Sequence, residues 1–115
     1  MRNFIQQGDR LPITAPSGGT TAGVGVLTGA HLFGVALNTN AQNESTELLI
    51  EGVVEIAKTS ALAIAVGDLL YWDNTNKVVN KTSTSQKPVG YAVTAAVNPS
   101  ATVLMRLVPN ITPAA

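Results

Sequence analysis

The sequence has no cysteine among its 115 residues. Disulfide bonds, thiolate catalysis and thiolate metal sites are therefore excluded. Charge is scarce as well, because only 12% of the residues are charged and seven basic side chains balance seven acidic ones. No two basic residues are adjacent, whereas nucleic-acid binders usually carry a basic excess or a basic stripe. Such low charge leaves little repulsion between chains and suits a protein that is assembled against other protein.

Long hydrophobic segments are also missing. The longest apolar run without glycine covers residues 61–66, which is far too short to span a bilayer. Residues 1–5 are followed by polar residues and a glycine, so the apolar region of a signal peptide is not formed. We therefore expect no membrane partner and no nucleic-acid partner. We also expect synthesis in the cytoplasm, where the protein stays unless it leaves inside a particle.

Short apolar runs separated by turn-forming residues are what the sequence does contain. Gly, Asp, Asn, Ser and Pro bound these runs, as is typical of strands in a small barrel or sandwich. The clearest of the predicted strands lie at residues 69–72, 77–80, 89–95 and 102–108. The only tryptophan and both tyrosines fall in this half of the chain, so its largest apolar side chains should meet there.

The first half continues the same pattern. A loop rich in Gly, Ser and Thr at residues 15–25 leads into predicted strands at residues 24–28 and 32–37. Alternation over residues 48–58 predicts a further strand, and residues 61–66 indicate a short helical turn or a loop. The sequence thus predicts an all-β fold of about eight mostly antiparallel strands in one small β-barrel or sandwich domain over residues 1–115.

The two ends of the chain differ from the middle. Residues 1–13 predict an extended arm, because Gly8 and Asp9 form a turn signal and Pro12 disfavours helix before it. Within the arm, Phe4 and Ile5 are either part of an edge strand packed on the chain's own barrel or an anchor inserted into a neighbour. The proline-containing tail at residues 109–115 is predicted to be loose.

The alternation also predicts which side chains are buried, although it leaves open which face of the last strands points inward. The predicted core or oligomer interface includes Leu48, Ile50, Val54, Ile56, Leu70, Trp72, Val89, Tyr91, Val93, Leu104 and Val108.

Motifs for catalysis and cofactor binding are incomplete. The glycines at positions 18 and 23 have the spacing of a phosphate loop, but Val24 and Gly25 stand where lysine and a hydroxyl residue are needed. His31 is the only histidine and has no local nucleophile or orienting group. Asp68 and Asp73 are interpreted as turn caps rather than calcium ligands. We predict no enzyme activity and no catalytic, cofactor or metal-binding residue.

The aromatic residues Tyr71, Trp72 and Tyr91 allow two interpretations. They could form a platform on which a sugar or base stacks, but nucleic-acid platforms come with a positive groove, which this sequence lacks. Packing in the core or at a subunit interface is the favoured interpretation.

Six segments, taken in order, carry a family resemblance. They read NFIQQGD at residues 3–9, TAPSGG at 14–19, LFGVA at 32–36, EGVVEIAK at 51–58, GDLLYWD at 67–73 and VGYA at 89–92. The first, fourth and fifth are the most specific. Together they resemble small phage head decoration proteins, also called capsid cement proteins, over nearly the whole chain.

The resemblance implies a non-enzymatic module on the outside of a tailed-phage capsid, where it would clamp neighbouring major capsid subunits after the shell expands. It implies a virion location and a homo-oligomer, a trimer in preference to a dimer, with no cofactor. The contact residues it suggests are Arg2, Asn3, Phe4, Ile5, Gln6, Gln7, Pro16, Ser17, Gly18 and Gly19. The alternatives are another virion part, such as a tail or connector component, and a small ligand-binding barrel that uses Trp72 and Tyr91.

Overall fold

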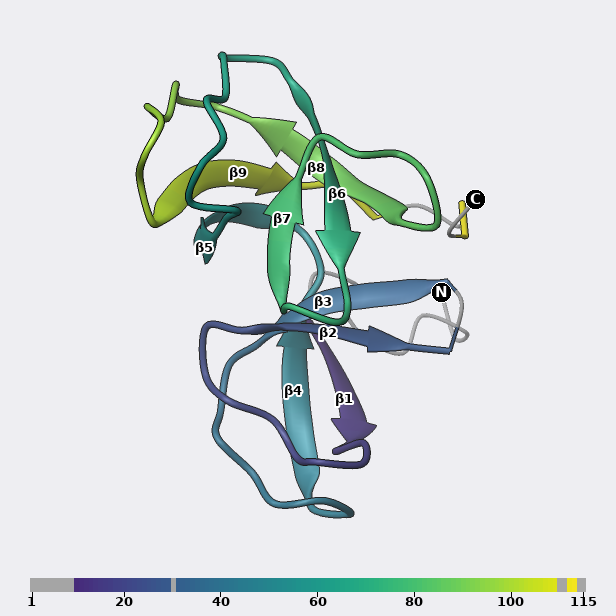
Figure 1. The fold of residues 1–115 in the computed structure, drawn as a ribbon. Coiled ribbons are helices and arrows are strands. Elements are labelled where there is room, and N and C mark those ends of the chain that lie inside the picture. The colour runs from purple at the N-terminus through teal and green to yellow at the C-terminus, as the bar shows by residue number, and fades with distance from the viewer. Residues whose placement is uncertain (1–9, 30, 110–111, 114–115) are drawn as a thin grey trace.

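The computed structural model describes residues 10–29, 31–109 and 112–113. These residues form nine strands and no helix, so the predicted all-β class is confirmed. A four-stranded antiparallel sheet has the strand order β1-β4-β3-β2, and a five-stranded antiparallel sheet has the order β5-β9-β8-β6-β7. Figure 1 shows the two sheets placed end to end, with the tip of the β6–β7 hairpin reaching toward β2 and β3.

The four-stranded sheet is built from the first half of the chain. Its strands are β1 (Arg10–Thr14), β2 (Gly25–Thr28), β3 (Leu32–Ala36) and β4 (Ser45–Leu49). Residues 1–9 of the predicted arm lie outside the described residues, and residues 10–13 belong to β1. β1 is an edge strand, which is where the proline at position 12 is tolerated, because an edge strand leaves some N–H groups without a ladder partner.

The five-stranded sheet is curled into a half-barrel. Its strands are β5 (Gly52–Ala57), β6 (Leu69–Asp73), β7 (Val78–Asn80), β8 (Lys87–Ala92) and β9 (Thr102–Leu107). The outer strands β5 and β7 meet at one end, where Lys58 and Val79 form a parallel bridge. The N–H of Thr59 also donates to the carbonyl of Val79 at 3.1 Å. This contact brings the two edges of the sheet together.

The chain passes from one sheet to the other at Gly52. The prediction of one continuous strand over residues 48–58 is therefore wrong, because β4 ends before this point and β5 begins in the other sheet. Gly52 has a φ of 134°, a conformation that glycine adopts far more readily than residues with a side chain. The predicted inward side chains of this segment are nevertheless buried or half-buried: Leu48, Ile50, Val54 and Ile56.

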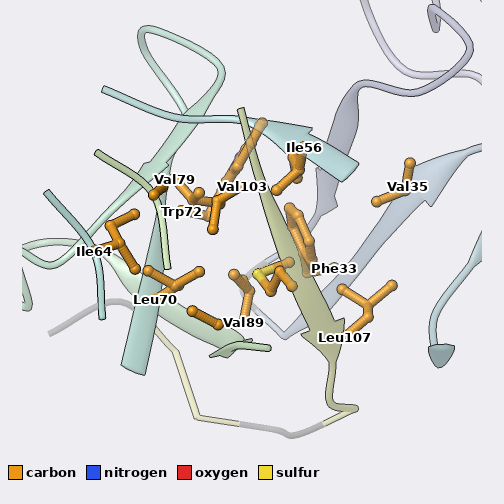
Figure 2. Close-up of a cluster of buried hydrophobic side chains, with 13 residues drawn as sticks. Phe33, Val35, Ile56, Ile64, Leu70, Trp72, Val79, Val89, Val103 and Leu107 are labelled. Carbon is orange, nitrogen blue, oxygen red and sulfur yellow. The ribbon is translucent and has the colours of Figure 1, made fainter. Parts of the chain in front are cut away.

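The hydrophobic core fills the half-barrel and extends into the joint between the sheets. Figure 2 shows side chains of β6, β7, β8 and β9 converging, with Phe33 and Val35 joining them from β3. Trp72 is only 2% exposed, which confirms its predicted place in the core. Because β3 contributes to this cluster, the two sheets share it, whereas Val26, Ala36 and Leu48 form a second, smaller cluster in the four-stranded sheet.

Two predicted core residues are exposed because strand parity differs from the expectation. The register between β8 and β6 shifts opposite Leu70 and Tyr71 of β6. Two successive residues of β8, Val89 and Gly90, are therefore both buried. Such an irregularity reverses the alternation that follows it. Tyr91 therefore points outward and is 37% exposed.

In β9 the face that points inward is opposite to the face that carries the predicted core residues Leu104 and Val108. Val103, Met105 and Leu107 are buried, whereas Leu104 is exposed. Both faces of this strand carry apolar residues, so alternation alone did not decide between them. The predicted core residues Val93 and Val108 are half-buried.

The segments expected to be irregular have defined contacts. Residues 61–66 contain turns and a bridge between Ile64 and Ala96 rather than a helix, so the loop interpretation holds. In the tail, which was predicted to be loose, the carbonyl of Thr112 accepts a hydrogen bond of 2.7 Å from the Nζ of Lys87. Lys87 is buried, and this burial lowers its pKa. Thr112 is thus tied to the half-barrel.

Candidate binding surfaces

The predicted contact residues fall into two groups. Arg2, Asn3, Phe4, Ile5, Gln6 and Gln7 lie outside the described residues. Pro16, Ser17, Gly18 and Gly19 form a turn between β1 and β2, in which the N–H of Gly19 donates to the carbonyl of Pro16 at 2.8 Å. The structure therefore gives a location to the second group, which we call the glycine turn.

The glycine turn lines a groove of about 410 Å³. Asn74 and Lys77, from the tip of the β6–β7 hairpin, line the same groove, together with residues 24–27 on and before β2. The lining residues thus come from both sheets. Sequence reasoning missed Asn74 and Lys77, because it predicted the strands at residues 69–72 and 77–80 but had no signal that the segment joining them meets a loop far away in the chain.

The two glycines of the turn serve different needs. Gly19 has a φ of 75°, and a Cβ atom at this position would overlap the backbone carbonyl oxygen of Asn40. The neighbouring Thr20 pairs with Asn40 through backbone hydrogen bonds of 2.8 and 3.1 Å. Gly18 has a φ of 89° but no atom within 4 Å of such a Cβ. Gly19 therefore permits the close approach of two loops, whereas Gly18 only shapes the exposed turn.

Both aspartates interpreted as turn caps have this role. The carboxylate of Asp73 accepts hydrogen bonds from the N–H groups of Thr75 and Asn76 at 2.9 and 3.1 Å, and from Nδ2 of Asn76 at 2.9 Å. The bonds from Asn76 are the main cause of a lowered pKa of Asp73. Asp68 accepts the N–H of Ala65 at 2.8 Å, and this bond likewise lowers the pKa of Asp68.

The hairpin tip is attached to the core through Asn74. Its Oδ1 accepts hydrogen bonds from Nε1 of Trp72 at 3.0 Å and from Nζ of Lys77 at 2.9 Å. Trp72 is itself buried in the joint between the sheets. The position of this groove wall is therefore fixed by a core residue.

A second candidate surface lies on the outside of the half-barrel. The strand register places Val53 beside Arg106, Arg106 beside Tyr91, and Tyr91 beside Leu69. These residues form a row across four strands, which with Leu104 we call the outer wall. All four of its apolar side chains are exposed. Contiguous exposed apolar side chains are typical of protein interaction surfaces.

Charges of both signs are mixed into the outer wall. The guanidinium of Arg106 donates to the hydroxyl of Tyr91 at 3.4 Å, and this hydrogen bond raises the pKa of Arg106, to which the charge of Glu51 also contributes. Glu55 accepts a hydrogen bond of 3.4 Å from the hydroxyl of Thr102. A partner for this surface would have to match one cation and two flanking carboxylates.

The aromatic residues do not form a shared platform. Trp72 is buried among core side chains, whereas Tyr91 lies on the outer wall and Tyr71 is half-buried. A ligand-binding barrel that uses Trp72 together with Tyr91 is therefore excluded. The alternative interpretation, packing in the core, is confirmed for Trp72.

Neither a metal-binding cluster nor a membrane-spanning helix is found in the described part of the chain. Within residues 10–29, 31–109 and 112–113, no group of three or more His, Asp or Glu side chains could hold a metal ion. In the same residues, no helix is long and apolar enough to cross a membrane.

The interior of the domain is filled by its own side chains. Its candidate binding surfaces are a groove lined from both sheets and the apolar outer wall. These features define a small β-rich module for binding other proteins. The family model described as phage cement protein matches residues 5–107. The chain therefore belongs to the phage cement protein family, as the resemblance indicated. No curated protein and no solved structure matches the chain.

Membership of this family indicates the general function of the chain. Phage cement proteins have a structural, capsid-stabilising role and are typically not enzymes, so the chain associates with a phage capsid and is located in the virion.

Proposed function

We propose that this protein decorates the outer surface of a tailed-phage capsid and bridges neighbouring major capsid subunits after the shell expands. It acts as a homo-oligomer, a trimer in preference to a dimer. The observation that carries the proposal is the family match over residues 5–107. The groove at the glycine turn supports it, because four of the suggested contact residues, Pro16, Ser17, Gly18 and Gly19, line one concave surface.

The position of β1 explains how one chain could reach two capsid subunits. The arm at residues 2–7 precedes Arg10, the first residue of β1, whereas the glycine turn follows Thr14, its last residue. Four steps along a strand correspond to about 13 Å. The chain therefore enters and leaves β1 at opposite ends of the strand, with the arm before the first end and the glycine turn after the second. Contacts at separate points across a subunit boundary would resist the outward pressure of packaged DNA.

Each element offers a different kind of contact. β1 is an edge strand of its sheet, and edge strands can be extended by a further strand from a partner. The arm could continue this pairing, with Phe4 filling a pocket of a capsid subunit. Ordering the arm costs about 1–2 kcal/mol of backbone entropy per residue. Contacts beyond Phe4 and Ile5, including those in the groove, must therefore contribute to the binding energy.

Fractionated virions test the proposal directly. We expect the protein on DNA-filled heads in a copy number comparable with that of the major capsid protein. Purified protein should bind expanded empty capsids and raise their thermal stability, because a ligand stabilises the state that it binds. It should bind unassembled capsid subunits much more weakly, since bridging needs two neighbours. A few copies per particle on tails would support the alternative of a tail or connector component, and absence from virions would refute both.

A further inference from the structure

One end of the half-barrel is covered by two loops that contain no charged residue. The loops, residues 59–67 and 93–101, lie together at the end of the half-barrel away from the four-stranded sheet (Figure 1). We call this surface the apex. Val66 and Val97 are 67% and 71% exposed, more than any other large apolar side chain in the described chain. The apex also exposes Pro99 and five alanines: Ala61, Ala63, Ala65, Ala95 and Ala101.

The apex is held by backbone hydrogen bonds along its length. Ile64 and Ala96 exchange two N–H to carbonyl bonds of 2.8 Å, and both side chains are buried in the core. The N–H of Ser100 donates to the carbonyl of Ser60 at 3.1 Å, and that of Gly67 donates to a carbonyl of β8 at 2.8 Å. Since small side chains on a fixed backbone lose little conformational entropy on burial, the apex is preorganised for contact.

Lys58 lies beneath the apex, and the partly exposed ion pair of Asp68 and Lys81 lies beside it. Lys58 is buried, and its Nζ donates to the carbonyls of Thr59 at 2.8 Å and Ser60 at 3.3 Å. The carboxylate of Asp68 accepts the N–H of Ala65 and pairs with Lys81 at 3.4 Å. Lys58 and Asp68 thus hold the loops in place, and the loops themselves present only uncharged side chains.

An uncharged surface suits a copy of itself better than it suits other partners. Around a rotation axis, residues near the axis face their own copies, so that any charge there meets a like charge, which is unfavourable. The apex avoids this repulsion, whereas the outer wall mixes Arg106 with Glu51 and Glu55 and requires a complementary pattern. We propose that copies of this chain associate through the apex, around a rotation axis that passes near Val66 and Val97.

This assignment rests on the proposed homo-oligomer and names its surface. β6 begins beside the apex at Leu69 and ends at Asp73, next to the hairpin residues that line the groove. The apex and the groove therefore lie at opposite ends of the same strand. Association through the apex leaves the glycine turn of every copy accessible to a capsid subunit.

Charge placed at the apex provides the test. The full chain, Val97→Asp and Val97→Lys are compared by sedimentation velocity over a concentration series. Val53→Asp is the matched control, since Val53 is also an exposed valine, 56% exposed, but lies on the outer wall. We expect each Val97 variant to weaken self-association at least tenfold, with unchanged circular dichroism, and Val53→Asp to leave it unchanged. An equimolar mixture of the Asp and Lys variants should associate more strongly than either variant alone, because in a mixed trimer two of the three pairs near the axis join opposite charges.

Several outcomes would overturn the assignment. These are a wild-type chain that stays monomeric at all concentrations, Val97 variants that associate like the wild type, and a mixture that stays monomeric. Loss of association in Val53→Asp alone would place the contact on the outer wall instead. Binding of the same proteins to empty capsids is measured separately. Failure of wild type to bind would refute the proposed decoration and leave the apex result intact, whereas capsid binding by a monomeric variant would separate the two surfaces.

Discussion

The rings of Phe33 and Trp72 contact each other with their centroids 5.0 Å apart and their planes inclined by 52°. Phe33 belongs to β3 and Trp72 to β6, so this pair joins the two sheets. Gly25 in β2 lies against both rings, because a Cβ atom there would come within 2.7 Å of Phe33 and 2.8 Å of Trp72. The joint is therefore closely packed, and the loss of either ring would leave a cavity between the sheets.

The first prediction concerns this joint. Trp72→Ala should lower the free energy of unfolding by about 3–5 kcal/mol, because it removes a buried ring and leaves a cavity. Tyr91→Ala, on the exposed outer wall, should change it by about 0.5 kcal/mol or less. Urea denaturation of both variants provides the measurement. An unchanged denaturation midpoint for Trp72→Ala would show that the ring does not hold the sheets together.

The glycine turn supplies the second prediction. Gly19→Ala should weaken binding to empty capsids more than Gly18→Ala does, because only the former places a Cβ against the Asn40 carbonyl and displaces the loop from the groove. Both glycines have positive φ, so both alanine variants carry backbone strain of about 1–2 kcal/mol. The difference in capsid affinity between the two variants therefore reports the effect of the close approach to Asn40. Equal affinities for the two variants would exclude the groove as a capsid contact.

The third prediction is a pH dependence at the hairpin tip. Hydrogen bonds, chiefly from Asn76, lower the pKa of Asp73 below its ordinary 3.8. A lowered pKa in the folded state means that the carboxylate stabilises the fold above pH 3.8 and loses this effect as the pH falls through the folded-state value. Asp73→Asn should therefore be less stable than the wild type at neutral pH, and the difference should shrink on acidification. A difference that is constant across this range would contradict the cap.

The fourth prediction concerns the arm. Deletion of residues 1–7 should leave the unfolding transition unchanged and abolish or strongly reduce decoration of empty capsids. The physical reason is that we expect Phe4 and Ile5 to act as an anchor, which contributes energy only when a partner binds it. Circular dichroism and capsid sedimentation are measured on the same preparations. Full occupancy by the truncated protein would leave the glycine turn as the remaining candidate contact.

Sequence patterns predicted the strands where turn chemistry and alternation agree. Residues 69–72 were predicted as a strand with Trp72 inside, and both predictions are confirmed. The break at Gly52 was missed, because the alternation of apolar residues continues in phase from β4 into β5 although the two strands belong to different sheets. Only the glycine itself marked the position, and a glycine within a strand pattern more often indicates a bulge.

The outward orientations of Tyr91 and Leu104 depend on how their strands pair in the folded domain. No sequence feature within β8 indicates the register shift against β6 that turns Tyr91 outward. For β9, Arg106 on the same face as Leu104 was a usable signal, because a charged side chain favours the solvent side. For the candidate site, the sequence pointed to Pro16, Ser17, Gly18 and Gly19. It did not predict that the β6–β7 hairpin meets them, since that contact joins loops from different sheets.

The pairing of β5 with β9 has a consequence for synthesis of the chain. β1 to β4 occupy a contiguous stretch, so the four-stranded sheet has all its strands as soon as Leu49 has left the ribosome. β5 must wait for β9, the last strand, which pairs with it along its whole length. A chain terminated before Thr102 would keep β5 as an unpaired edge, a template for aggregation. Only chains that extend through β9 would therefore have β5 paired within the half-barrel.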